Sequence, residues 1–235
     1  MKVLVTGANG FVGSHMCHFL LAKGYDVHAL IRTTSDLSTF KLIIPGWRQI
    51  HLHYGDLRDY SSLIPLVKRK DYIFHIAGTI KGSAYQEFHE GNYHGTCNLL
   101  KACYKYNPQV KRIVMTSSMV ARGPGTISCP QCEDDENLRP LDRDYYGTSK
   151  YLAECATQNL MGKLPIVIVR PPTVIGPGDK VSLDLFRIAK MGMKMFVSGD
   201  PRPFSIVHVE DLVKGIYQCS QMEVACGKIF NFASH

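Results

Sequence analysis

Tyr146 and Lys150 stand four residues apart at the start of a segment with a helical pattern, Asp144-Tyr-Tyr-Gly-Thr-Ser-Lys150. On a helix, side chains at this spacing share one face. A phenol with an ordinary pKa of about 10 is a poor acid or base at neutral pH, and a neighbouring ammonium would lower that pKa by stabilising the phenolate. The pair therefore predicts proton transfer at an oxygen atom, although an ordinary surface Tyr–Lys pair explains the same spacing equally well.

Three glycines near the N-terminus supply a second candidate site. Gly7, Gly10 and Gly13 follow an apolar run over residues 2–6 and precede a helix-like pattern over residues 11–21. Such glycines allow a tight turn, a close approach of the backbone to a pyrophosphate and close packing of helix on strand, so that free N–H groups face an anion. The spacing differs from the common Gly-x-Gly-x-x-Gly fingerprint, and an ordinary glycine-rich turn is the alternative.

The elements that must position these residues alternate along the chain. Strands are expected near residues 2–6, 26–31, 49–54, 71–75, 110–116 and 165–169, with helical segments between them. This pattern predicts an α/β fold with a doubly wound parallel sheet, a Rossmann fold, in which ligands bind at the carboxyl ends of the strands. Two long loops, 122–143 and 171–180, follow strands at that edge and are expected to help build the site.

Composition narrows the class of protein. The chain has 235 residues, of which 45% are hydrophobic and 20% charged, as in a soluble globular protein. Without an apolar run of roughly 20 residues or a signal peptide, a cytoplasmic location and no membrane contact are expected. The net charge of +7 comes from scattered residues and suits an anionic cofactor better than nucleic acid.

The eight cysteines are expected to be reduced thiols. Cys129-Pro-Gln-Cys132 has metal or redox spacing, but a structural zinc site needs a second such pair, so no metal is expected. The acidic run over residues 133–136 is interpreted as part of a solvated loop.

Several motifs in register resemble the extended short-chain dehydrogenase/reductase family, also called the NAD-dependent epimerase/dehydratase family. They are Thr6-Gly-Ala-Asn-Gly-Phe-Val-Gly13, His75-Ile-Ala-Gly78, Asn92-x-x-Gly-Thr96, Thr116-Ser-Ser118, Tyr146-x-x-x-Lys150, Arg170-Pro-Pro172 and Phe204-Ser-Ile-Val-His-Val-Glu-Asp211. Together they span essentially the whole chain. The resemblance implies a dinucleotide-binding Rossmann domain over residues 1–170 and, over residues 171–235, a small, apparently truncated substrate-binding region interleaved with the last sheet elements.

The resemblance also implies a role for each site residue. Tyr146 would be the general acid/base, and Lys150 would lower its pKa and hold the nicotinamide ribose. Ser118 would hydrogen-bond the reacting carbonyl or hydroxyl, with Ser117 as its nearest rival. Asn92 would support the lysine through a water molecule.

The cofactor would lie along the carboxyl edge of the sheet, with Asp56 at the adenine. An N-cap role is the alternative for Asp56, although Asp59 fits such a role better. The implied contacts are Gly7, Asn9, Gly10, Phe11, Val12, Gly13, Arg32, Asp56, Leu57, Ile76, Ala77, Gly78, Tyr146, Lys150, Pro171, Thr173 and Val174.

The end of the second expected strand bears on the choice of cofactor. Where NAD-preferring relatives carry an acid for the ribose hydroxyls, this chain has Ile31, followed by Arg32. A guanidinium suits a 2′-phosphate, so NADP is predicted as the preferred cofactor over NAD. An arginine that merely stacks on the adenine is the alternative.

Departures from the family narrow the reaction. Met119-Val120 stands where sugar-nucleotide dehydratases carry Asp-Glu, which argues against dehydration. Arg122-Gly123 and Pro172-Thr173 differ from the usual epimerase segments, and the pattern looks more like the branch of dihydroflavonol reductases and 3β-hydroxysteroid dehydrogenases. Reversible ketone/alcohol oxidoreduction on a small molecule is the leading hypothesis. The alternatives are an NAD-dependent sugar-nucleotide 4-epimerase and a dinucleotide-binding sensor without activity.

The C-terminal end resembles a late strand of the family, so elements that close the substrate pocket are expected to be missing. By the same resemblance, a homodimer would form through the helices around residues 83–106 and 146–160.

Overall fold

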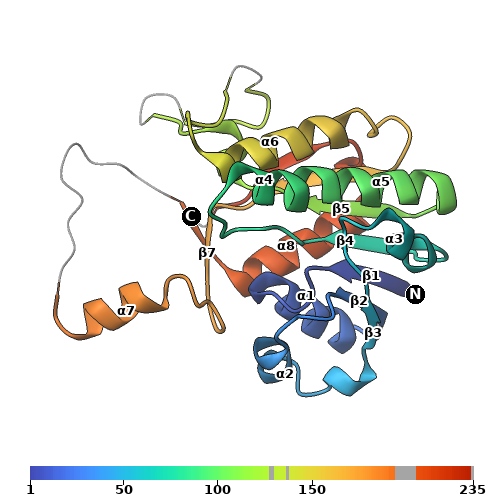
Figure 1. The fold of residues 1–235 in the computed structure, drawn as a ribbon, viewed down its shortest axis with the longest axis horizontal. Coiled ribbons are helices and arrows are strands. Elements are labelled where there is room, and N and C mark those ends of the chain that lie inside the picture. Colours follow the sequence, from blue (N-terminus) through green and yellow to red (C-terminus); the bar gives the residue numbers. More distant parts are fainter. Residues whose placement is uncertain (127–129, 136–137, 194–204, 234–235) are drawn as a thin grey trace.

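The computed structural model describes residues 1–126, 130–135, 138–193 and 205–233. Within these residues, seven strands form one parallel sheet in the order β3-β2-β1-β4-β5-β6-β9. Helices cover both of its faces (Figure 1). The predicted doubly wound parallel sheet is confirmed, and each predicted strand agrees with an observed one to within two residues at either end.

The strands of the sheet are β1 (Lys2–Thr6), β2 (Asp26–Ile31), β3 (His51–Tyr54), β4 (Tyr72–His75), β5 (Arg112–Thr116), β6 (Ile166–Arg170) and β9 (Ile229–Asn231). The helices are α1 (Phe11–Ala22), α2 (Ser38–Ile43), α3 (Tyr60–Val67), α4 (Tyr85–Phe88), α5 (Gly95–Tyr106), α6 (Tyr145–Gln158), α7 (Leu183–Lys190) and α8 (Val209–Gln221). A parallel pair is formed by β7 (Thr173–Ile175) and β8 (Ile206–His208).

The buried strands send alternate side chains to opposite helical layers. Val3 and Val5 of β1 join a core cluster with residues of α1, α2 and α8, whereas Leu4 joins a cluster with residues of α3 and α5. The apolar runs of the strands are therefore continuous rather than alternating, because water reaches neither face.

The chain after β6 adds one strand, β9, to the same sheet. After β6, the chain forms β7, and α7 then stands apart from the helical layers (Figure 1). It returns through β8 to α8, whose Leu212 and Ile216 are buried in the cluster shared with α1, and ends with β9 against β6.

Two local features were not expected from the sequence. A π-helix, His89–His94, connects α4 to α5, and a 3-10 helix, Met119–Arg122 (η3), follows β5. Helices with π geometry are uncommon and occur often at functional sites. Cys129, Glu136 and Phe204, which belong to segments noted in the sequence, lie outside the described residues.

Candidate active site

A cavity of about 2010 Å³ lies at the carboxyl ends of β1, β4, β5 and β6, where the strand order reverses between β1 and β4. Ligands of doubly wound sheets bind at this position. Every residue predicted to contact a cofactor lines the cavity, from Gly7 to Val174, as does Ser118. Parts of both long loops, residues 123–126 and 171–174, also line it.

The glycine turn forms one wall of the cavity through close backbone contacts. Gly7 has a φ of 68°, and a Cβ there would lie 2.6 Å from the Cα of Ala77. A Cβ on Gly13 would collide with the carbonyl oxygen of Gly7, so α1 packs against the turn only because Gly13 has no side chain. Helix α1 begins after Gly10 without a side-chain cap, which leaves its first N–H groups available to an anion. This cradle fits the pyrophosphate of a dinucleotide.

At the opposite wall, helix α6 carries Tyr146 and Lys150. The Asp144 side chain caps the helix by accepting a hydrogen bond from the Gly147 N–H at 2.8 Å. Lys150 is 4% exposed, and its Nζ donates to the Thr116 carbonyl at 3.0 Å. Burial lowers the pKa of Lys150 to about 8.

The tyrosine differs from the sequence-based expectation. Burial raises the pKa of Tyr146 to about 12, although a hydrogen bond with the Ser118 side chain acts in the opposite direction. Desolvation of the phenolate is the largest influence on this pKa, and the role of Lys150 in lowering it stays a prediction. The Lys150 ammonium meanwhile donates to Thr116. Tyr146 is consequently a neutral phenol at pH 7, in the protonation state of an acid rather than a base.

The two neighbouring serines have different surroundings. Ser118 is partly exposed and lines the cavity. Ser117 also lines the cavity but is only 3% exposed, and its Oγ has no hydrogen-bond partner within the described ranges. This contrast favours Ser118 over Ser117 as the group that faces a substrate.

Asn92 lies behind the cavity wall, in the π-helix, and is 2% exposed. Its Nδ2 donates to Ser149 Oγ at 2.8 Å, and its Oδ1 accepts from the Thr79 N–H at 2.6 Å. A Cβ on Gly78 would approach both Lys150 Nζ, at 3.0 Å, and Asn92 Oδ1, at 3.3 Å. Asn92 thus connects α6 to the segment after β4, close to the lysine that it was predicted to support.

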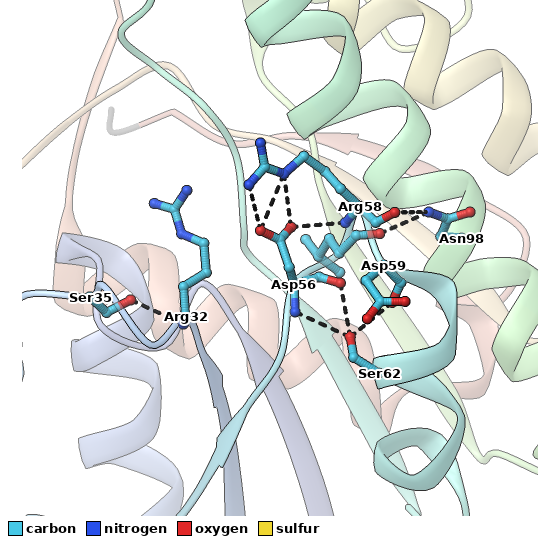
Figure 2. A network of polar contacts seen from close by, with 8 residues as sticks. Arg32, Ser35, Asp56, Arg58, Asp59, Ser62 and Asn98 are labelled. Carbon is cyan, nitrogen blue, oxygen red and sulfur yellow. Dashed lines mark hydrogen bonds and ion pairs between the residues drawn. The ribbon is translucent and has the colours of Figure 1, made fainter.

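At the far end of the cavity, Arg32 faces a network around Asp56 (Figure 2). The Asp56 carboxylate accepts hydrogen bonds from Arg58, at 2.7 Å from Nη2 and 2.9 Å from the backbone N–H. These bonds hold the pKa of Asp56 below its ordinary value. Asn98 of α5 fixes the loop by donating to the Leu57 carbonyl at 2.9 Å.

Helix α3 begins at Tyr60, directly after the next acidic residue, Asp59, which accepts a hydrogen bond from the Ser61 N–H at 2.9 Å. The N-cap is therefore Asp59, as expected, and the N-cap alternative for Asp56 is wrong. Arg58 also lines the cavity but was missed. The sequence feature that could have identified Arg58 is a basic residue two positions after Asp56.

Within the described residues, no group of three or more His, Cys, Asp or Glu side chains is placed to hold a metal ion. Cys129, half of the only pair with metal spacing, falls outside them. No helix in the described part of the chain is long and apolar enough to cross a membrane.

A doubly wound sheet with a glycine-rich phosphate cradle and, on the opposite wall, a Tyr–Lys pair with a buried lysine is the arrangement of a dinucleotide-binding protein. Comparison with known sequences agrees: the profile of the NAD-dependent epimerase/dehydratase family matches residues 3–233. The chain belongs to this family.

Similar proteins have diverse activities. A ceramide reductase of Caulobacter vibrioides is 28% identical over 89% of this chain and 57% of its own length. A protein of Bacillus subtilis described as an uncharacterized UDP-glucose epimerase, YtcB, is 30% identical over 92% of this chain and 71% of its own. Sterol demethylase protein B of Methylococcus capsulatus is 30% identical over 91% of this chain and 64% of its own length. The chain thus spans between 57% and 71% of the length of these three relatives.

Among solved structures, the epimerase Mth375 of Methanothermobacter thermautotrophicus is similar with a TM-score of 0.84 and 27% identity, over 99% of this chain and 71% of that one. MoeE5, solved with UDP-glucose and NAD, is similar with a TM-score of 0.78 and 26% identity, over 100% of this chain and 76% of that one.

Proposed function

We propose that the protein is an NADP(H)-dependent oxidoreductase that interconverts a ketone and a secondary alcohol, with Ser118, Tyr146 and Lys150 as its catalytic residues. The observation that carries this proposal is that Ser118, Tyr146 and Lys150 line the same cavity, with Lys150 buried four residues after Tyr146 on α6. A high pKa keeps Tyr146 protonated at neutral pH, as reduction of a carbonyl requires.

A nicotinamide cofactor supplies a hydride for the carbonyl carbon when it is bound. The chain's own residues handle the oxygen. Ser118 would donate a hydrogen bond to the carbonyl oxygen, and Tyr146 would transfer its proton to that oxygen as negative charge develops there. Lys150, a cation near the phenol, would stabilise the phenolate that remains. The product is an alcohol, and the reverse reaction needs the phenolate as base.

The preference for NADP is proposed from the adenosine end of the cavity. Ile31 is 2% exposed and apolar, so no carboxylate stands at this position to accept ribose hydroxyls or to repel a 2′-phosphate. Arg32 lines the cavity, and Figure 2 shows its side chain beside the network of Asp56 and Arg58. A charged hydrogen bond from Arg32 to a 2′-phosphate would favour NADP.

Sugar-nucleotide 4-epimerisation is the second candidate function, because similar chains include YtcB and the epimerase Mth375. Purified protein should be incubated with NADPH or NADH and a panel of ketones, and separately with NAD and UDP-sugars. Carbonyl-dependent oxidation of NADPH supports the reductase. Interconversion of UDP-sugars without net change of the cofactor supports the epimerase, and cofactor binding with neither reaction supports a sensor.

The cofactor preference has its own test. Arg32→Ala should weaken NADPH binding by roughly 10-fold or more while changing NADH binding little, since a hydrogen bond to a charged group contributes about 1.5–3 kcal/mol. Arg48→Ala is the matched control, because Arg48 is exposed and does not line the cavity. Equal affinity of the wild-type protein for both cofactors would overturn the preference.

We also propose a homodimer through the outer surface of α4, α5 and α6. Exposed aromatic side chains occur there at Tyr85, Tyr104 and Tyr145, and the rings of Tyr85 and Tyr145 lie 5.8 Å apart. Light scattering after size-exclusion chromatography tests this proposal, and a monomer at micromolar concentration would contradict it.

A further inference from the structure

Three charged side chains are buried near the candidate active site and take no part in the proposed proton transfer. Glu154 and Arg170 are 0% exposed, and Arg122 is 6% exposed. Arg170 donates to both carboxylate oxygens of Glu154, from Nε at 2.9 Å and from Nη2 at 2.8 Å. The Nε of Arg122 lies 3.4 Å from the same carboxylate. A carboxylate so fully removed from water is stable only with such partners.

Each of the three residues belongs to a different segment of the active site. Arg122 is the last residue of η3, which begins directly after Ser118. Glu154 lies in α6, four residues and thus about one turn after Lys150. Arg170 ends β6 and immediately precedes Pro171 in the cavity wall. One buried carboxylate therefore connects the segments that carry the serine, the tyrosine with its lysine, and the wall expected beside the nicotinamide.

The network continues toward the C-terminal edge of the sheet. Arg170 Nη1 donates to the Glu133 carbonyl at 3.3 Å, and Glu133 Oε1 accepts from the Asn231 N–H at 2.8 Å. Glu133 is thus half-buried and bonded, so the solvated-loop interpretation of the acidic run is wrong at this residue. The loop and β9 are held to the same cluster of charges.

We propose that Glu154 is a positioning residue: through Arg122 and Arg170 it fixes the three active-site segments relative to one another, and its negative charge keeps the buried Lys150 in the ammonium form. This inference rests on the proposed function of Lys150 as the cation beside Tyr146. It assigns Glu154 no contact with substrate or cofactor.

The electrostatics of α6 support the second part of this proposal. Burial lowers the pKa of Lys150 to about 8, and the charge of Glu154 acts against that shift. Without the Glu154 charge, the pKa of Lys150 would fall further. A larger fraction of the lysine would then be neutral at pH 7, and a neutral amine stabilises a phenolate poorly.

The direct experiment is NMR titration of the full chain labelled with [13Cε]lysine, with Lys150→Met to assign the Lys150 signal. In Glu154→Gln, the Lys150 titration should move to lower pH, and Glu154→Asp should restore much of the wild-type value. Glu154→Gln leaves Arg170 buried beside a neutral group and could fail to fold, so a second variant is required.

That variant is Glu154→Met/Arg170→Met, in which apolar side chains replace the closest ion pair and Arg122 retains its contact with the Tyr151 ring. Such replacements are often neutral or favourable for stability. A network that serves only the fold predicts a folded double variant with the wild-type Lys150 titration, and that result would overturn the proposal. A folded double variant with the titration shifted to lower pH supports it.

Turnover gives a second readout. It is measured with Glu154→Gln, or with the double variant Glu154→Met/Arg170→Met if Glu154→Gln does not fold. With the panel substrate that the wild-type protein reduces, kcat should fall severalfold at pH 7 with the KM for NADPH nearly unchanged. Part of the loss should be regained at pH 6, where Lys150 is again protonated. A loss that does not change between pH 6 and pH 8 would overturn the electrostatic role. If Tyr146→Phe retains turnover, the proposed function fails, yet the Lys150 titration still decides the role of Glu154.

Discussion

The two ends of the cavity are built by different physical means. At the phosphate end, Gly7 and Gly13 bring backbone against backbone, and no charged side chain belongs to the turn of residues 7–13. At the catalytic end, Lys150, Glu154 and Arg170 are charged side chains buried almost completely. The phosphate end requires glycines, because a Cβ at these positions would collide with neighbouring backbone. The catalytic end requires charged side chains that are shielded from water. Substitutions should therefore act through steric fit at one end and through protonation at the other.

The largest effect is expected at the catalytic end. Tyr146→Phe removes the proton donor and should lower kcat by roughly 10²- to 10⁴-fold, the usual contribution of a general acid or base. Cofactor affinity, measured by fluorescence titration with NADPH, should stay nearly constant because the ring remains.

Tyr145→Phe is the matched control for this variant, since Tyr145 is its neighbour in sequence and is 43% exposed. Turnover by the control should be close to that of the wild-type protein. A Tyr146→Phe enzyme that retains full activity would contradict the catalytic role of the phenol.

At the phosphate end, Gly13→Ala should reduce both stability and cofactor affinity. The new Cβ collides with the Gly7 carbonyl oxygen, and overpacking of this kind costs about 1–3 kcal/mol of unfolding free energy. Because α1 must shift to relieve the collision, its N–H groups move and NADPH should bind at least several-fold more weakly.

Gly162→Ala serves as the control, because a Cβ there has open space around it and the backbone has no positive φ. Urea denaturation and NADPH titration of both variants make the measurement. If Gly13→Ala and Gly162→Ala behaved alike, the steric account of the phosphate end would fail.

The buried lysine gives the catalytic end a distinctive dependence on pH. Lys150 has a pKa of about 8 in the folded protein and an ordinary value of 10.5 in the unfolded chain. Between these values the unfolded state binds more protons, so stability increases with pH over this range. Below pH 8, burial of the ammonium costs up to about 3 kcal/mol, and above 10.5 this cost is absent.

Lys150→Met should therefore be more stable than the wild-type protein at pH 7 by up to about 3 kcal/mol, with a difference that shrinks as the pH rises from 8 to 10.5. Denaturation at several pH values tests this, and the exposed Lys163→Met is the control. A pH-independent difference between Lys150→Met and the wild type would show that burial of the charge is not the cause.

The smallest effect is expected for Arg58→Gln at the adenosine end. Loss of the ion pair with Asp56 should weaken binding of NADP and NAD by the same factor, about two- to fivefold, in line with a partly exposed ion pair. Isothermal titration with both cofactors measures this. Loss of affinity for NADP alone would mean that Arg58, like Arg32, contacts the 2′-phosphate.

The sequence by itself determined the parts of the molecule that depend on local pattern. The order of strands and helices follows from hydrophobic periodicity, and the glycine turn follows from steric rules that act over a few residues. The spacing of Tyr146 and Lys150 also gave their shared helix face, because helix geometry fixes which side chains are neighbours. These features place the cavity at the carboxyl edge of the sheet.

Only the tertiary structure decided the electrostatics of the site. Glu154 is 32 residues from Arg122 and 16 from Arg170, and nothing in their spacing indicates that the fold joins them. The pKa of Tyr146 is raised to about 12 instead of lowered, because burial, which the sequence does not show, is the largest influence on it. Desolvation and charge pairing depend on which distant segments exclude water together, and that is a property of the packed chain rather than of any local pattern.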